Sequence, residues 1–156
     1  MKAKREYQHK IELEKNGFTL IEVLFAITII SILSMISMPL YQNYQVRTKV
    51  SGELSLMRPL MTSMIEKYAL YSEWPSSNAD AGAREPEFYK GKYLLSATIS
   101  DSPQAGTMTL VYDVDKLPAL RGTNTLVFYP GEGNNSANWK CDQGSLPSKY
   151  RPSNCQ

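Results

Sequence analysis

The stretch GFTLIEVLFAITIISILSMISMPL, residues 17–40, decides how this chain of 156 residues is organised. From Phe18 to Leu40 it holds 23 residues and one charge, Glu22. A helix of that length rises about 34 Å, which is enough to cross a hydrocarbon layer about 30 Å thick. The segment is therefore predicted to span a membrane, although the mean hydropathy of the whole chain, -0.34, is that of a soluble protein.

The residues before Phe18 are too polar to form a core of their own. They carry five Lys or Arg and three Glu, and they outweigh Arg47 and Lys49 on the far side of the apolar segment. The positive-inside tendency therefore keeps residues 1–17 in the cytoplasm and exports the C-terminal part. The end of the apolar run offers no small-x-small pair for an ordinary signal peptidase, so we expect this run to be retained.

The exported part contains both cysteines, Cys141 and Cys155, and no histidine. Two thiols without a nearby histidine cannot build a four-ligand zinc site, so their simplest use is one disulfide, formed in an oxidising compartment. The missing histidine excludes Ser-His-Asp and Cys-His catalysis. We therefore expect no enzymatic activity, no metal site and no cofactor.

After Leu40 the apolar residues recur at spacings of three and four, which predicts one amphipathic face. We therefore predict a single helix from Phe18 to Tyr71. Its first part, residues 18–40, is apolar all round, and residues 41–72 continue it as an amphipathic helix. Pro39 and Pro59 each remove a backbone donor and are predicted to bend it.

The rest of the chain reads as a long connection followed by strands. Residues 73–106 contain three X-Pro pairs and no sustained periodicity, which predicts a connecting loop with one extended piece at residues 93–99. Residues 107–156 are predicted to form an antiparallel sheet and a disulfide-bonded C-terminal loop. The strands are expected at Thr107–Val114, Asn124–Pro130 and Ser136–Cys141, with GEGNN (131–135) as a hairpin turn. A sheet covering the helix stripe gives an α+β fold.

The order of basic leader, Gly17, Phe18, Thr19-Leu20-Ile21, Glu22 and apolar helix resembles the N-terminus of type IV prepilins, which carry a class III signal peptide, and of the related pseudopilins. The two helix prolines and the late cysteine pair resemble the type IVa pilins. The close match covers residues 1 to about 60. It implies a type IV pilin fold and a prepilin peptidase that cuts after Gly17 and methylates the amine of Phe18. It also implies that Glu22 pairs with the Phe18 amine of a neighbouring subunit.

The resemblance implies a structural subunit of an extracellular type IV pilus of a bacterium. The subunit would wait in the inner membrane until assembly machinery there extracts it into a homopolymer. Adhesion, twitching motility and DNA uptake are the roles the family offers, with a host surface or DNA as the partner. The alternatives are a minor pilin, including a DNA-binding competence pilin, a pseudopilin of type II secretion, or a membrane-anchored binding module that never polymerises.

Charge bears on the DNA alternative. Without residues 1–17 the chain carries 12 basic and 12 acidic residues, a balance that suits close packing into a polymer. Lys140, Lys149 and Arg151 lie in or beside the cysteine loop, next to aromatic residues, and are the candidate DNA contacts. The alternative is that these cations only keep the surface soluble. The lack of a strong basic patch favours this alternative.

Overall fold

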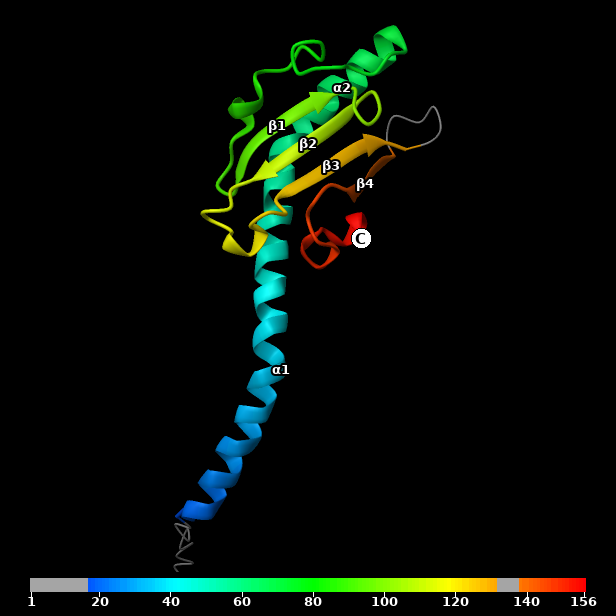
Figure 1. The fold of residues 1–156 in the computed structure, drawn as a ribbon. Helices are drawn as coiled ribbons and strands as arrows, with labels where there is room; N and C mark the ends of the chain where they lie inside the picture. The colour runs from blue at the N-terminus through cyan, green and yellow to red at the C-terminus, as the bar shows by residue number, and fades with distance from the viewer. Residues whose placement is uncertain (1–16, 132–137) are drawn as a thin grey trace, which may run out of the picture. The chain divides into compact units, whose positions relative to one another are not determined.

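Figure 1 shows the computed structural model, which describes residues 17–131 and 138–156. The leader up to residue 16, most of the predicted turn GEGNN and the start of the third predicted strand lie outside the described residues. The chain divides into two compact units between Met38 and Pro39. Each unit is described by itself.

The N-terminal unit contains the first half of helix α1 (Leu20–Glu53). Among the described residues, one helical stretch is long and apolar enough to span a membrane, with a mean hydropathy of 2.4 over its best 18 residues. The hydroxyl groups in this segment donate to backbone carbonyls of the preceding turn, at 2.7 to 2.9 Å. The pairs are Thr28 to Phe25, Ser31 to Ile27, Ser34 to Ile30 and Ser37 to Leu33. Each hydroxyl is thus satisfied within its own helix.

The helical part of the C-terminal unit is less regular than predicted. The end of α1 passes into a 3-10 turn, η1 (Leu54–Met57), before α2 (Arg58–Tyr71) begins. The predicted long helix is confirmed over Leu20–Tyr71, and the 3-10 turn η1 lies within it. Pro59 lies in the first turn of α2, where a missing N–H leaves no intrahelical bond unmade, so the chain changes helix type just before it.

Four antiparallel strands form the sheet, in chain order. They are β1 (Leu94–Ser100), β2 (Thr107–Tyr112), β3 (Thr125–Pro130) and β4 (Trp139–Gln143). The α+β prediction is confirmed. The extended piece predicted at residues 93–99 is strand β1, which pairs with β2 along its length. The connecting loop is therefore shorter than the predicted 73–106. A register irregularity, typical of a β-bulge, lies between Leu94 and Ser96.

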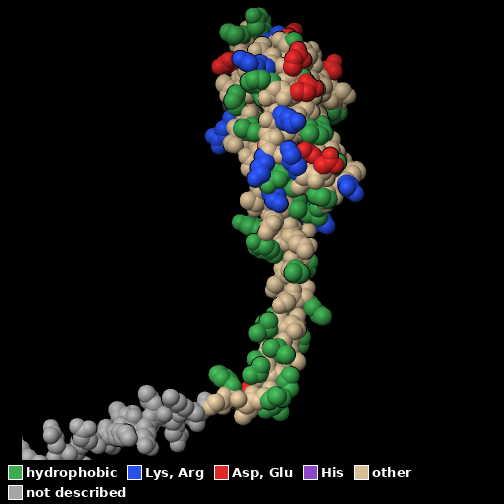
Figure 2. All heavy atoms as spheres, turned by 90° about the vertical axis from the view of Figure 1, so that its left-hand side faces the viewer, with side chains coloured by type: hydrophobic (Ala, Val, Ile, Leu, Met, Phe, Trp, Pro, Cys, Tyr) green, Lys and Arg blue, Asp and Glu red, His purple; other side chains and the backbone are tan. Residues whose placement is uncertain are grey.

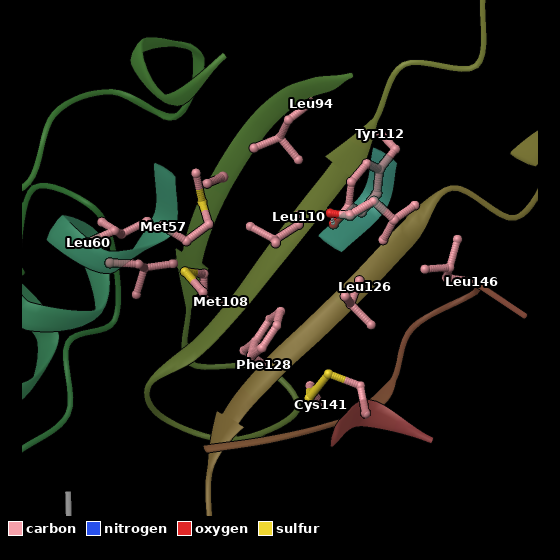
Figure 3. Close-up of a cluster of buried hydrophobic side chains, with 14 of the residues drawn as sticks. Met57, Leu60, Leu94, Met108, Leu110, Tyr112, Leu126, Phe128, Cys141 and Leu146 are labelled. Atoms are coloured by element: carbon pink, nitrogen blue, oxygen red, sulfur yellow. Dashed lines mark hydrogen bonds between the residues drawn. A yellow bond between two sulfur atoms is a disulfide. The ribbon is translucent and has the colours of Figure 1, made fainter. Parts of the chain in front are cut away.

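The core lies between the helices and one face of the sheet (Figure 3). Met57, Leu60 and Met64 form the buried helical stripe. They lie against sheet residues that are equally buried: Leu94, Ala97, Ile99, Met108, Leu110, Tyr112, Leu126 and Phe128. The predicted alternation of Met108, Leu110 and Tyr112 toward the core is confirmed.

A buried carboxylate joins the end of α1 to the start of the sheet. Glu53 is 6% exposed, and its Oε1 accepts a hydrogen bond from the Tyr93 N–H at 2.9 Å. Its Oε2 is buried without a hydrogen-bond partner among the described residues. Burial, and next the charge of Glu53, raise the pKa of Tyr112, whose hydroxyl donates to the Val50 carbonyl at 3.3 Å. Glu53 therefore places a carboxyl group inside a largely apolar layer.

Candidate functional site

The predicted processing and assembly residues stand at the start of α1. Glu22 Oε2 accepts hydrogen bonds from the Thr19 N–H at 2.8 Å and the Thr19 hydroxyl at 2.7 Å. In return, the Glu22 N–H donates to Thr19 Oγ1 at 3.3 Å. This reciprocal arrangement is a capping box, which satisfies two of the backbone donors left open at a helix start. Thr19 is thus a functional residue of the motif that the sequence analysis missed, although the T-x-x-E spacing was the signal for it.

The capping box engages one of the two carboxylate oxygens of Glu22. Oε2 carries both bonds from Thr19, whereas Oε1 accepts none from the described residues. The side chain is exposed beside the first turn of the helix, where the macrodipole favours a negative charge. The carboxylate is therefore fixed in orientation by its own subunit and remains open to a cation from outside.

The residues just before the cap are accessible. Phe18 is 88% exposed, and no described atom lies within 4 Å of the position that a side chain at Gly17 would take. An enzyme could reach the peptide bond between them without moving any described residue.

Apolar side chains cover the helix that follows, and nothing in the described part of the chain covers them. Figure 2 shows these side chains standing open along the segment. The large residues more than two-fifths exposed include Leu20, Ile21, Phe25, Ile30, Ile32, Leu33, Met35, Ile36, Met38 and Leu40. A continuous apolar surface of this extent marks contact with lipid or with other protein chains.

The C-terminal loop is closed as predicted, because a disulfide joins Cys141 and Cys155. Arg151 fixes the chain inside this loop. Its guanidinium donates to the carbonyls of Leu146 at 2.8 Å, Gly144 at 3.1 Å and Asp142. The loop is therefore shaped by an internal network as well as by its covalent closure.

This network bears on the three candidate DNA contacts. The Arg151 guanidinium holds loop carbonyls, so its donors are largely used. Lys140 and Lys149 are exposed but border different hollows of the surface. The neighbouring aromatics are occupied too, since Trp139 packs edge-on against Trp74 with ring centroids 5.7 Å apart and Tyr150 is buried. The structure does not bring these residues together as a stacking platform.

Comparisons with known proteins agree with these features. Residues 46–156 match the family model of pilin, the bacterial filament protein, and residues 14–38 match the prokaryotic N-terminal methylation motif. The fimbrial protein EcpC of Eikenella corrodens is 31% identical over 142 residues, which are 91% of each chain. A type IV major pilin protein, PilE1, of Neisseria gonorrhoeae is 32% identical over 83% of this chain and 76% of that one.

The fold is also that of a solved pilin. The crystal structure of a type IV pilin of Pseudomonas aeruginosa matches with a TM-score of 0.50 at 23% identity, over 71% of this chain and 97% of that one. Together, the family match over most of the chain, the methylation motif at its start and the shared fold confirm the resemblance to type IV pilins. The chain belongs to the pilin family, whose members are non-enzymatic filament subunits that enter a membrane as prepilins and are assembled into extracellular pili.

Proposed function

We propose that this chain is the repeating subunit of a type IV pilus, a homopolymer of the processed protein. The observation that carries the proposal is the uncovered apolar helix within the stretch that matches the methylation motif. Such a surface is stable in lipid before assembly and among the helices of neighbouring subunits afterwards. The relatives named as type IV major pilins support the repeating role over that of a minor pilin or a secretion pseudopilin.

Processing prepares the helix for this transfer. A prepilin peptidase of the inner membrane removes residues 1–17 after Gly17 and methylates the new amine of Phe18. Assembly machinery in the same membrane then moves the subunit into the filament. Pro39, inside α1, and Pro59, in the first turn of α2, are the points at which the helices bend during packing.

Glu22 pairs with the Phe18 amine of the neighbouring subunit. A lone carboxylate in an apolar bundle is costly, and a partner of opposite charge offsets much of that cost. The capping box supports this role, because Thr19 holds one carboxylate oxygen and leaves Oε1 for the amine. The pair would also set the axial register between subunits.

Three substitutions separate the charge of Glu22 from its capping role. Glu22→Gln keeps an oxygen that can accept from Thr19 but removes the charge, whereas Thr19→Ala removes the hydroxyl part of the cap and keeps the charge. Glu22→Ala removes both. We expect pilus yield to collapse in both Glu22 variants and to fall less in Thr19→Ala, with the leader still removed in all three.

The measurements are the yield of sheared filaments and the intact mass of the membrane-bound protein. Wild-type filament yield in Glu22→Gln would overturn the charge pair. A bulky substitution at Gly17 is the complementary control, because it should leave the leader attached. Mass spectrometry of purified filaments distinguishes the repeating subunit, present as the bulk component, from a minor one.

Adhesion to a host surface, twitching motility and DNA uptake are the roles proposed for the filament. The guanidinium of Arg151 already donates its hydrogen bonds to loop carbonyls, which reduces the support for DNA contact at the C-terminal loop. DNA binding by assembled filaments that disappears in Lys140→Gln and Lys149→Gln would restore it.

A further inference from the structure

A hollow of about 300 Å³ lies where the exported part of the chain begins. Leu40, Asn43, Tyr44, Arg47 and Lys149 line it, and all five belong to the C-terminal unit. Leu40, one of the lining residues, is the last residue of the apolar segment. Neither of its cations has a carboxylate partner in the described part of the chain, where the ion pairs involve other lysines.

A backbone link holds the two cations at this hollow. The Arg47 guanidinium donates from Nε and Nη2 to the Lys149 carbonyl, at 3.2 and 3.0 Å. An arginine has five N–H donors, so donors remain after this contact. The Lys149 ammonium lies 4.8 Å from the ring centroid of Tyr150, which is buried. The charges come from residues 102 positions apart in the chain and are oriented before any ligand arrives.

The depth of the hollow relative to a membrane follows from the helix rise. Arg47 is seven residues beyond Leu40, which is about 10 Å along a helix. The headgroup layer extends roughly 5 to 8 Å beyond the hydrocarbon on each side. A long basic side chain reaches back across the difference, as such residues do near membrane surfaces. Tyr41 and Tyr44, 62% and 65% exposed, stand at the depth where aromatic residues gather at membrane interfaces.

We propose that this hollow binds the headgroup of an anionic phospholipid while the subunit waits in the membrane. Arg47 and Lys149 bind the phosphate, and Leu40 and Tyr44 contact the glycerol and the first methylenes below it. Two cations beside the exposed side chains of Leu40 and Tyr44 fit an amphiphile with a negative head, whereas a nucleic acid would leave the apolar side chains unmatched. The proposal rests on membrane insertion of the prepilin and not on the Glu22 charge pair.

Native mass spectrometry of the full chain, released from micelles containing phosphatidylglycerol or phosphatidylcholine, tests this site. We expect wild-type protein to retain phosphatidylglycerol and the double variant Arg47→Gln/Lys149→Gln to retain about 30-fold less, as expected for losing two cations beside an anionic surface. Lys49→Gln/Lys140→Gln is the matched control. It removes two cations that do not line the hollow, and it should behave as wild type.

Three results would overturn the proposal. The first is equal retention of phosphatidylglycerol by wild type and the Arg47/Lys149 variant, with circular dichroism and the disulfide unchanged. The second is that wild type retains phosphatidylcholine as well as it retains phosphatidylglycerol, which would show that the cations do not select a lipid by its headgroup charge. The third is displacement of the lipid by a small excess of inorganic phosphate, which would show a free-anion site. Glu22→Ala should retain the lipid fully, so failure of filament assembly and failure of this site are separable.

Discussion

The two halves of helix α1 place the same kind of residue in opposite surroundings. From Leu20 to Met38 every described residue is exposed, whereas Val50 and Glu53, with Met57 in the turn that follows, are buried beneath the sheet. Val50 packs into the core of the C-terminal unit, whereas no apolar residue from Leu20 to Met38 is covered by the described part of the chain. The C-terminal unit therefore has its own packed core, while the N-terminal half of the helix depends on lipid or other subunits.

The largest expected effect comes from cutting between these halves. A fragment of residues 39–156 should remain folded, monomeric and soluble without detergent, because its core contains no residue from the apolar segment. Pro39 then begins the helix, a position that suits proline. The full chain should need detergent. Circular dichroism and light scattering check this, and a fragment that aggregates or loses its sheet would contradict the comparison.

Removing the disulfide should produce the next largest effect, and within the C-terminal unit alone. Cys141 and Cys155 close a loop of 15 residues, for which chain entropy predicts a loss of about 3 kcal/mol in the free energy of unfolding. Denaturant unfolding of the Cys141→Ser/Cys155→Ser fragment measures this. If α1 in the full chain lost helicity in micelles as well, the two halves would not be independent.

Alanine substitutions at two glycines should change the free energy of unfolding in opposite directions. A Cβ at Gly91 would lie 1.7 Å from Glu53 Oε2, so Gly91→Ala must displace Glu53 from the Tyr93 N–H. We expect a loss of about 2 kcal/mol in the free energy of unfolding, as for leaving a partly buried polar group without its hydrogen-bond partner. Gly52→Ala is the matched control, because nothing lies within 4 Å on an exposed helical site. It should gain about 0.5 to 1 kcal/mol. If wild type and Gly91→Ala unfolded at the same midpoint, Glu53 would not stabilise the contact between helix and sheet.

The smallest expected effect is on the surface of the C-terminal unit. The hydrogen bond from Lys67, followed by that from the Ser76 N–H, lowers the pKa of Asp80 below its ordinary value of 3.8. A lowered pKa in the folded state means that the unfolded chain binds more protons, so this contribution is present above pH 3.8 and is lost as pH falls through the lowered value.

The measurement is the difference in melting temperature between the wild-type and Asp80→Asn fragments. This difference should be small at neutral pH, since the ion pair is partly exposed, and it should vanish in strong acid or high salt. Asp101→Asn, at an exposed site, is the control. A difference that persists in acid would assign the effect to something other than the charge.

Some of this molecule could be predicted from its sequence because the signals were local and strong. The 23 apolar residues, the Gly17 to Glu22 motif and the alternation of Met108, Leu110 and Tyr112 each depend on neighbours in the chain. The disulfide followed from having two cysteines. These features fixed the α+β class and the assembly motif.

The remaining features of the structure depend on contacts between residues that are distant in the sequence, which no local pattern predicts. The extended piece at residues 93–99 is visible in the sequence, but its pairing with β2 is not. The 3-10 turn η1 replaces α-helical geometry where the apolar spacing continues unchanged. The sequence predicts Arg151 as a candidate DNA contact, whereas the loop carbonyls that bind its guanidinium come together only when the chain has turned back on itself. The hollow at Arg47 and Lys149 joins residues 102 positions apart. Thr19 differs from these, since its spacing to Glu22 was visible.

The serine hydroxyls of the apolar segment have a consequence for assembly. Ser31, Ser34 and Ser37 each donate to a carbonyl of their own helix, so none of them requires a donor or acceptor from its surroundings. These three side chains keep the same hydrogen bonds whether lipid or protein surrounds the helix. Moving them from one environment to the other therefore requires no exchange of hydrogen-bond partners.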